Sequence, residues 1–436
     1  MAGHSLLTGG NDLAMAAQGH AGAPSVERGR LPNGLEVVVR RRQDAETVAL
    51  NLLVRAGSRF ESDHCSGASN FVQRMFTQGT PTRPDRDAVM GTVTSRGGTL
   101  DVSNSLEFVE FLVALAPEDF ELGLELLTDL LANSTFASDR IEHQRQLILS
   151  ELALRRDNPS ARAFDLFHTH VFANHPLKYL PTGDVTGTVR MTREHLLEFR
   201  RQRFTPPTMV LGVVGPFSSD QVSSALESTL GTLEAGAVVE DAGAPPPTAV
   251  AREVQYAAGR DQAMVLIGAP TVGLKHPDRY PLWLLQAILG PSGGRLFYDI
   301  RDARGLAYDT NVRLASTADC GSIIAYAGTD PANVELVSGL LFSHFDRVRS
   351  ERVTPVELAN AVGYIVGGTT VGTEQGTAQA SHLVRSAALG LPIEIAELEA
   401  NLQAVSTGDV HQVAVQYLAP ERLTRVVVAP GSRVWQ

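Results

Sequence analysis

The stretch Ser66-Gly-Ala-Ser-Asn-Phe-Val-Gln-Arg-Met-Phe-Thr-Gln-Gly79 carries the clearest helical pattern in the 436-residue sequence. Its apolar residues stand at positions 68, 71, 72, 75 and 76, and this spacing predicts an amphipathic helix with one buried face. Gly79 suits the position beyond the helix end, where a left-handed backbone carries no Cβ penalty. The same spacing brings Asn70, Gln73 and Arg74 together beside the apolar stripe.

The polar face of this helix has the spacing of a zinc helix but not its ligands. In an H-x-x-E-H helix two imidazoles bind the metal and the glutamate acts as general base. Here Asn70 and Gln73 offer neutral amides, and Arg74 is a permanent cation that cannot lose its proton to bind a metal. The sequence therefore predicts no metal on this helix.

Ala56-Gly-Ser-Arg-Phe-Glu61 before the helix and Gly79-Thr80 after it complete a pattern that resembles the pitrilysin and mitochondrial processing peptidase family. In that family the helix reads approximately G-L-A-H-F-L-E-H-M and is followed by G-T. The resemblance implies that Asn70 replaces the first histidine, Gln73 the catalytic glutamate and Arg74 the second histidine. It therefore also implies that the chain has no hydrolase activity on its own.

Glu151 lies in another amphipathic stretch, residues 139–156, which predicts a helix ended by Asp157-Asn-Pro159. Apolar residues share its face, so we expect its carboxylate to turn inward. The resemblance places Glu151 at the third zinc ligand of the family. Because an arginine in a vacated metal position satisfies the leftover carboxylate, we expect Glu151 to pair with Arg74.

The stretch Gly290-Pro-Ser-Gly-Gly-Arg-Leu-Phe-Tyr-Asp-Ile-Arg-Asp-Ala-Arg-Gly-Leu-Ala-Tyr308 predicts a turn, a helix over 295–304 and then a strand. A glycine-rich loop before a helix can bind phosphate, but the Lys and hydroxyl residue of a P-loop are missing. The stretch closely resembles the family's S-R-L-F-x-x-I-R-x-x-R-G-L-A-Y segment. This implies that Arg301 helps to hold substrate and that Tyr308 donates a hydrogen bond to its carbonyl or developing oxyanion. In members that pair as dimers, these two residues face the metal helix of the other subunit.

Length and composition predict two domains of about 200 residues each. The proline run in Glu240-Asp-Ala-Gly-Ala-Pro-Pro-Pro247 is typical of an extended linker. Both halves close with a helix, a proline turn and a strand, at 204–216 and 417–430, which indicates an internal repeat. Together with the resemblance, this predicts an α+β fold of two repeated halves, each a mostly antiparallel sheet with helices packed on one side. The expected segments are a flexible arm over 1–24, peptidase-like halves over 25–232 and 251–436, and the linker over 233–250.

Two other segments invite a functional interpretation. Residues 99–115 are rich in Leu, Phe and Val and predict a buried strand. The resemblance implies an Asn there that holds substrate as an added strand, but Asp101 occupies its place. His168, His170 and His175 could suggest a metal site, yet residues two apart on a helix point in different directions, so we expect no metal there.

The formal net charge of −11 argues against nucleic acid and anionic membranes as partners. No apolar run reaches the roughly 18 residues that a membrane helix needs, so no transmembrane segment is expected. Cys65 and Cys320 have the spacing of neither a disulfide framework nor a metal site. A cytoplasmic location is expected, and a periplasmic protein with few cysteines is the alternative.

The leading hypothesis is a non-catalytic subunit of a heteromeric zinc metalloendopeptidase. A homologous subunit with an intact H-x-x-E-H helix would carry the zinc, and this chain would bind no cofactor itself. The two would enclose a chamber for unfolded peptides, held by β-addition, with Arg301 and Tyr308 acting on the partner's site. Open alternatives are a structural or assembly protein of the same fold without a peptidase role, a homodimeric peptide-binding protein, and an independent zinc enzyme with rearranged ligands.

Overall fold

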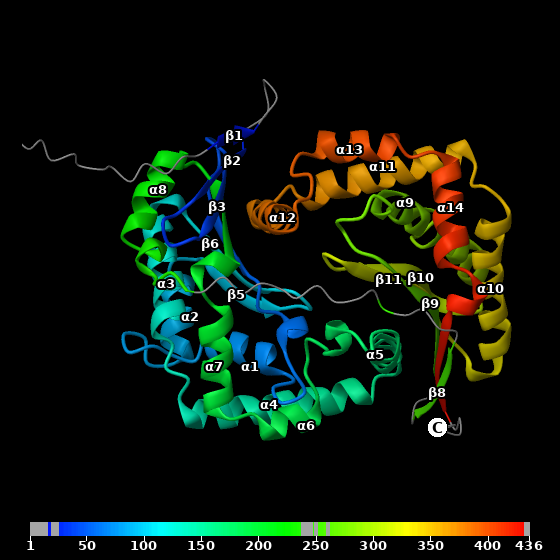
Figure 1. Cartoon of the computed structure of the whole chain (residues 1–436), viewed down its shortest axis with the longest axis horizontal. Coiled ribbons are helices and arrows are strands. Elements are labelled where there is room, and N and C mark those ends of the chain that lie inside the picture. The colour runs from blue at the N-terminus through cyan, green and yellow to red at the C-terminus, as the bar shows by residue number, and fades with distance from the viewer. Residues whose placement is uncertain (1–15, 19–25, 237–246, 248–251, 259–261, 431–436) are drawn as a thin grey trace, which may run out of the picture.

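The computed structural model describes residues 16–18, 26–236, 247, 252–258 and 262–430. Two β-sheets form its framework, one in each half (Figure 1). The first sheet has the order β1-β2-β3-β7-β4-β6-β5, with strands β1 Ala16–Gln18, β2 Val26–Arg30, β3 Glu36–Arg41, β4 Val48–Val54, β5 Thr99–Asn104, β6 Val109–Leu115 and β7 Met209–Gly215. The second has the order β10-β11-β9-β12-β8, with strands β8 Arg252–Ala258, β9 Ala263–Val272, β10 Ala307–Ser316, β11 Cys320–Thr329 and β12 Thr424–Pro430.

Helices surround both sheets. Those of the first half are α1 Ala68–Met75, α2 Arg86–Thr94, α3 Phe120–Asn133, α4 Ser138–Arg156, α5 Pro159–Val171, α6 Val185–Arg190, α7 Arg193–Arg203 and α8 Ser219–Glu227. Those of the second half are α9 Arg279–Leu289, the π-helix η6 Phe297–Ala303, α10 Val334–Ser350, α11 Pro355–Gly372, α12 Gly376–Leu389, α13 Ile395–Gln403 and α14 Thr407–Tyr417. None of the helices within the described ranges combines the length and apolar character that a membrane crossing requires.

The same strand arrangement is built twice. In the first half the closing strand β7 lies between β3 and β4, parallel to β3 and antiparallel to β4. In the second half the closing strand β12 lies between β8 and β9 with the same directions. A proline-containing 3-10 turn precedes each closing strand, at Pro206–Thr208 and Pro420–Arg422. The predicted α+β fold of two repeated halves is confirmed.

One helix of each half packs against the sheet of the other half, which the sequence did not predict. Helix α12 lies on β4 and β7, where Leu383 and Val384 are buried with Val38 and Leu53 of the first sheet. Helix α5 lies in the same way on β9 and β12 of the second sheet. Each sheet therefore carries the predicted helices of its own half on one face and a single exchanged helix on the other.

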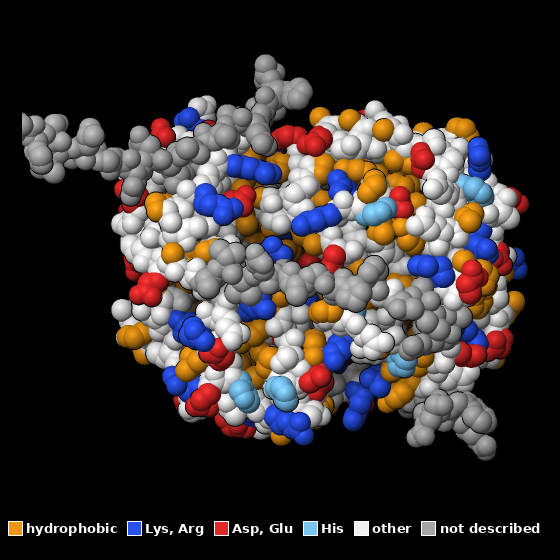
Figure 2. Space-filling model, in the orientation of Figure 1, with side chains coloured by type: hydrophobic (Ala, Val, Ile, Leu, Met, Phe, Trp, Pro, Cys, Tyr) orange, Lys and Arg blue, Asp and Glu red, His pale blue; other side chains and the backbone are white. Residues whose placement is uncertain are grey.

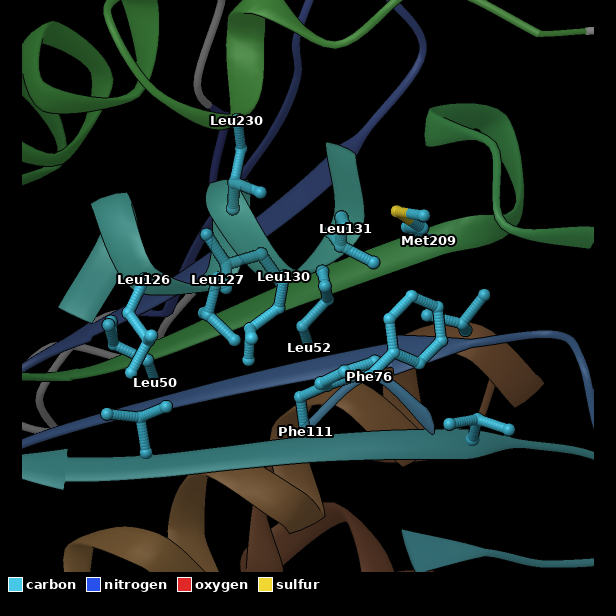
Figure 3. Close-up of a cluster of buried hydrophobic side chains, with 14 of the residues drawn as sticks. Leu50, Leu52, Phe76, Phe111, Leu126, Leu127, Leu130, Leu131, Met209 and Leu230 are labelled. Atoms are coloured by element: carbon cyan, nitrogen blue, oxygen red, sulfur yellow. The ribbon is translucent and has the colours of Figure 1, made fainter. Parts of the chain in front are cut away.

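The core of the first half forms around the end of α1 (Figure 3). The ring of Phe76 contacts those of Phe111 and Phe136 edge-on, with centroids 5.1 and 5.7 Å apart. Leucines of β4 and α3 surround them: Leu50, Leu52, Leu126, Leu127, Leu130 and Leu131. Burying each such side chain stabilises the fold by roughly 1.5–3 kcal/mol, so the apolar stripe fixes which face of α1 turns outward.

Some expected elements differ in the structure. Residues 99–115, predicted as one buried strand, form a hairpin of β5 and β6, because the Ser105 hydroxyl accepts the Phe108 N–H at 3.1 Å and closes a turn. Within the arm predicted over 1–24, residues 16–18 pair with β2. Most of the linker predicted over 233–250 lies outside the described residues, so these boundaries stay predictions.

Candidate functional site

Glu61 holds the N-terminus of α1 in place. Its two carboxylate oxygens accept the backbone N–H groups of Gly67 at 2.7 Å and Ser69 at 2.8 Å. Both donors belong to the first turn, whose N–H groups have no partner within the helix. Gly67 has φ +90°, a left-handed conformation that favours glycine. Burial raises the pKa of Glu61 to about 7, against the effect of these hydrogen bonds.

The polar face of α1 forms a small hydrogen-bond network. Asn70 Oδ1 accepts from Arg74 Nε at 3.0 Å and from Gln73 Nε2 at 3.4 Å. Asn70 Nδ2 donates to the carbonyl of Thr182 at 3.1 Å. The structure thus brings Asn70, Gln73 and Arg74 together, as the helical spacing predicted.

Arg74 and Glu151 form the predicted ion pair. Arg74 Nη1 and Nη2 donate to the two carboxylate oxygens at 3.1 and 2.5 Å and thereby join α1 to α4. The Arg74 side chain is 22% exposed and that of Glu151 is 56% exposed, so the carboxylate lies at the rim and does not turn fully inward as expected. An ion pair this exposed contributes about 1 kcal/mol or less. Its main consequence is geometric, because a cation fills the space between the two helices.

These residues do not fit a zinc ion. The Arg74 donors point at Asn70 Oδ1 and at both oxygens of Glu151, which are the oxygens that a metal would need, and guanidinium keeps its proton. Gln73 is an amide and cannot act as a general base. No H-x-x-E-H or H-E-x-x-H occurs in the sequence. In the part of the chain that the structure describes, no three His, Cys, Asp or Glu side chains are grouped to hold a metal.

Two adjoining cavities open beside this network. The first, of about 430 Å³, contains the Arg74–Glu151 pair. The second, of about 610 Å³, lies between the two halves and is called the inter-half cavity below. The two cavities adjoin, because four residues line both of them: Asn104, Arg155, Pro181 and Thr182.

Strand β5 borders both cavities and is the edge strand of the first sheet. Asp101, at the position where the resemblance implied a substrate-holding Asn, is exposed on this strand. Asn104 Nδ2 donates to the carbonyl of Pro181 at 2.7 Å. An edge strand beside a cavity can bind an extended peptide through backbone hydrogen bonds.

Arg301 and Tyr308 lie on the second half, and neither lines the cavity that contains Arg74. The Arg301 guanidinium lies 4.7 Å above the Phe297 ring in the π-helix η6. Tyr308 is 62% exposed, and its hydroxyl donates to Gln262 Oε1 at 3.4 Å. Its ring lies on Gly328, where an added Cβ would come within 3.3 Å of it. Both functional groups are therefore open to a second molecule.

The three histidines of interest bond to the nearby backbone. His168 Nε2 contacts the carbonyl of Leu177, and His170 Nδ1 lies 2.7 Å from that of Leu166. His175 is buried and accepts the Leu177 N–H at 3.1 Å. Burial lowers the pKa of His168 and of His175. These contacts give each imidazole a local structural role, His170 within α5 and His168 and His175 in the turn that follows it.

Sequence reasoning missed a buried ion-pair cluster that joins the halves. Arg59 Nη1 donates to Glu107 at 2.7 Å, and its Nη2 donates to Asp319 of the second half at 2.7 Å. Burial raises the pKa of Glu107. Burial also acts to raise the pKa of Asp319, but the hydrogen bonds and charge of Arg59 outweigh it and lower that pKa to about 2. The sequence signal was the Ala56–Glu61 motif, which marks Arg59 but not its distant partners.

Comparison with known proteins gives consistent matches. The family model described as Insulinase (Peptidase family M16) matches residues 36–182, and the model described as Peptidase M16 inactive domain matches residues 190–363. An uncharacterised zinc protease of Streptomyces coelicolor is 26% identical over 423 residues, which cover 95% of this chain and 91% of that protein. An uncharacterised zinc protease of Mycobacterium leprae is 29% identical over 373 residues, covering 84% and 83% of the two chains.

Solved structures match almost the whole chain. A protease from Helicobacter pylori superposes with a TM-score of 0.86 at 19% identity, covering 93% of this chain and 100% of that one. A peptidase M16 inactive domain from Pseudomonas fluorescens gives a TM-score of 0.85 at 18% identity, with 94% and 99% covered. At these identities the structural matches establish the fold alone.

Proposed function

The chain belongs to the M16 peptidase family, and from that premise we propose that it is the non-catalytic subunit of a heteromeric zinc metalloendopeptidase in the cytoplasm. A homologous partner subunit carries the zinc on an intact H-x-x-E-H helix. The two subunits enclose a chamber for unfolded peptides, and this chain supplies half of its wall.

One observation carries this proposal: Arg74 binds both oxygens of Glu151 at the positions where the family holds zinc. A permanent cation in that place supports the proposal that this chain does not bind the zinc. At the same time Arg301 and Tyr308 are retained and exposed. A chain without metal ligands but with these two groups is suited to complete another subunit's site.

In the assembled enzyme, Arg301 and Tyr308 face the partner's active site. Tyr308 donates its hydroxyl proton in a hydrogen bond to the substrate carbonyl, where negative charge develops during attack. Arg301 holds the substrate near that position. The exposed Tyr308 hydroxyl has a long hydrogen bond, 3.4 Å to Gln262 Oε1, which it can exchange for one to substrate.

The test begins with affinity purification of the native protein and identification of whatever co-elutes in equal amount. We expect a homologous chain with H-x-x-E-H. In that complex, Tyr308→Phe should lower turnover by roughly 10²–10³-fold, as loss of an oxyanion donor does, without weakening assembly. Arg301→Ala should also lower turnover. Tyr298→Phe is the matched control, since Tyr298 is 65% exposed and has no assigned role. Equal turnover of the Tyr308 variant and the wild type would contradict the proposal.

A second candidate is a homodimer that captures peptides without cutting them. The observation in its favour is that edge strand β5 and the two adjoining cavities lie within a single chain. Calorimetry with unstructured peptides on the isolated chain tests its peptide binding, and recovery of the chain without a zinc-bearing partner separates this candidate from the first. Recovery in a large membrane complex, with no effect of Tyr308→Phe, would instead favour a structural role.

A further inference from the structure

Among the described residues that line the inter-half cavity, one arginine has no carboxylate partner. Three arginines line the cavity: Arg155, Arg313 and Arg385. Arg155 binds both oxygens of Asp165, at 2.8 and 2.6 Å, and Arg385 donates to Glu110. The Arg313 guanidinium has no ion pair or hydrogen bond with any of the residues that the structure describes.

Arg313 is nevertheless held in a defined position. It lies on β10, the edge strand of the second sheet, and its guanidinium stands 5.3 Å from the centre of the Phe164 ring of α5. Phe164 in turn contacts the ring of Tyr326 edge-on, with centroids 5.3 Å apart. Stacking on an aromatic ring leaves the edge of the guanidinium, with its N–H donors, free to bind a planar anion.

The carboxylates that line this cavity are already bound. Glu107 accepts from Arg59 at 2.7 Å and from the backbone N–H of Ala318 at 3.1 Å, and Asp165 is paired with Arg155. Neither is available to Arg313. Arg313 is therefore the arginine of this cavity whose charge has no carboxylate partner among the described residues. In Figure 2, cationic and apolar side chains lie next to one another where the two halves meet.

Two edge strands approach this space, β5 from the first sheet and β10 from the second. Strand β5 borders both cavities, so a peptide bound along it extends from the Arg74–Glu151 cavity to the inter-half cavity. In an extended peptide, alternate side chains point to one side and can reach toward β10. The ligand group that Arg313 fits best is a carboxylate, which it can bind with two parallel hydrogen bonds.

We propose that the inter-half cavity binds an acidic side chain of an extended peptide and that Arg313 pairs with its carboxylate. The chamber thereby selects peptides with an Asp or Glu at one position over peptides with Gln or Lys there. This inference rests on the proposed function, since it takes an unfolded peptide as the ligand of the chamber.

Fluorescence anisotropy with the full-length chain tests the proposal. The probes are labelled unstructured peptides of about ten residues in which one Glu is moved along the sequence, each paired with Gln and Lys versions. At one position the wild type should bind the Glu peptide roughly 3–10-fold more tightly than the Gln peptide, as for a partly exposed ion pair. The preference should shrink with added salt.

Arg313→Gln should abolish the Glu preference while leaving binding of the Gln peptide unchanged, and Arg313→Lys should retain part of it. Arg352→Gln, an exposed arginine after α10, is the control and should keep the full preference. Thermal melts confirm that each variant folds. A wild type that binds Glu and Gln peptides equally at every position, a preference that survives in Arg313→Gln, or no binding of any peptide would overturn the inference. Co-purification and Tyr308→Phe turnover do not depend on Arg313 and judge the proposed function separately.

Discussion

Replacing Arg59 by alanine should destabilise the chain by about 3–5 kcal/mol at neutral pH, the usual cost of removing one partner from a buried ion pair. The Arg59 side chain is 7% exposed and that of Glu107 is 9% exposed, and their atoms lie 2.7 Å apart. Without Arg59, the carboxylate of Glu107 keeps a backbone donor, Ala318, but no counter-charge. Asp319 is 35% exposed, so water replaces its partner at little further cost.

The stability lost on replacing Arg59 by alanine should depend on pH in a defined direction. Burial raises the pKa of Glu107 in the folded protein, and removing the opposing charge of Arg59 raises it further. A carboxyl with a raised folded pKa stabilises the fold at low pH, and this stabilisation is lost as pH rises through that pKa. For Asp319, whose folded pKa is about 2, the wild-type stabilisation is present above its unfolded pKa and lost as pH falls toward 2. Both effects make the Arg59→Ala deficit largest near pH 8 and smaller near pH 4.

Thermal melts of wild type and Arg59→Ala between pH 4 and 8 measure this effect. For a half of about 200 residues, the expected loss lowers the Tm by roughly 6–20 °C at neutral pH. The double variant Arg59→Ala/Glu107→Gln should recover much of it, because the buried charge is then absent. Arg30→Ala is the control, since Arg30 is 65% exposed and 3.7 Å from Glu36. A deficit under 1 kcal/mol, or one independent of pH, would refute the reasoning.

Three further outcomes follow from the site. The stability of the wild type should fall as pH rises from about 4.5 to 7, because the pKa of Glu61 in the folded protein is raised to about 7 and its stabilisation is lost as pH rises through that value. In Glu61→Gln this dependence on pH should be absent, and thermal melts across the range measure it. Arg74→Ala and Glu151→Gln should each lower the free energy of unfolding in urea by about 1 kcal/mol or less, since the pair is partly exposed, and a loss of several kcal/mol would contradict this. Gly328→Ala should displace the Tyr308 ring, since the new Cβ would lie 3.3 Å from it. We expect lower turnover in the partner complex, with the free energy of unfolding changed by about 1 kcal/mol or less. Unchanged turnover would argue against a role of Gly328 in positioning the Tyr308 ring.

Local patterns predicted the elements that local interactions determine. The apolar spacing of α1 located both its buried face and the neighbouring Asn70, Gln73 and Arg74, because helical periodicity alone sets those directions. The pairing of Arg74 with Glu151 could be predicted since the family resemblance placed both residues around one vacated position. The strand repeat was visible in the two proline turns that precede β7 and β12.

Features that depend on contacts between distant segments could not be predicted in this way. Glu107 and Asp319, the partners of Arg59, lie in turns of different halves, and no local pattern joins them. The hairpin of β5 and β6 was missed because the short polar stretch Asn104-Ser105 between the two apolar segments was not interpreted as a turn, although the backbone and side chain of Ser105 both bond to Phe108. Nothing in the periodicity of α5 or α12 distinguishes a helix that covers its own sheet from one that covers the other.

The exchange of α5 and α12 also determines when the inner face of the first sheet can be buried during synthesis. Strand β7, the last of the first sheet, ends at Gly215, but the helix that covers the inner face of that sheet spans Gly376–Leu389. At ribosomal elongation rates, Val38 and Leu53 on that face remain uncovered for on the order of ten to thirty seconds, until α12 has been synthesised. During this interval the nascent first half exposes apolar surface to chaperones and to other chains. A gene truncated after the first half should therefore yield aggregated protein, and co-expression of residues 251–436 as a separate chain should restore a folded pair.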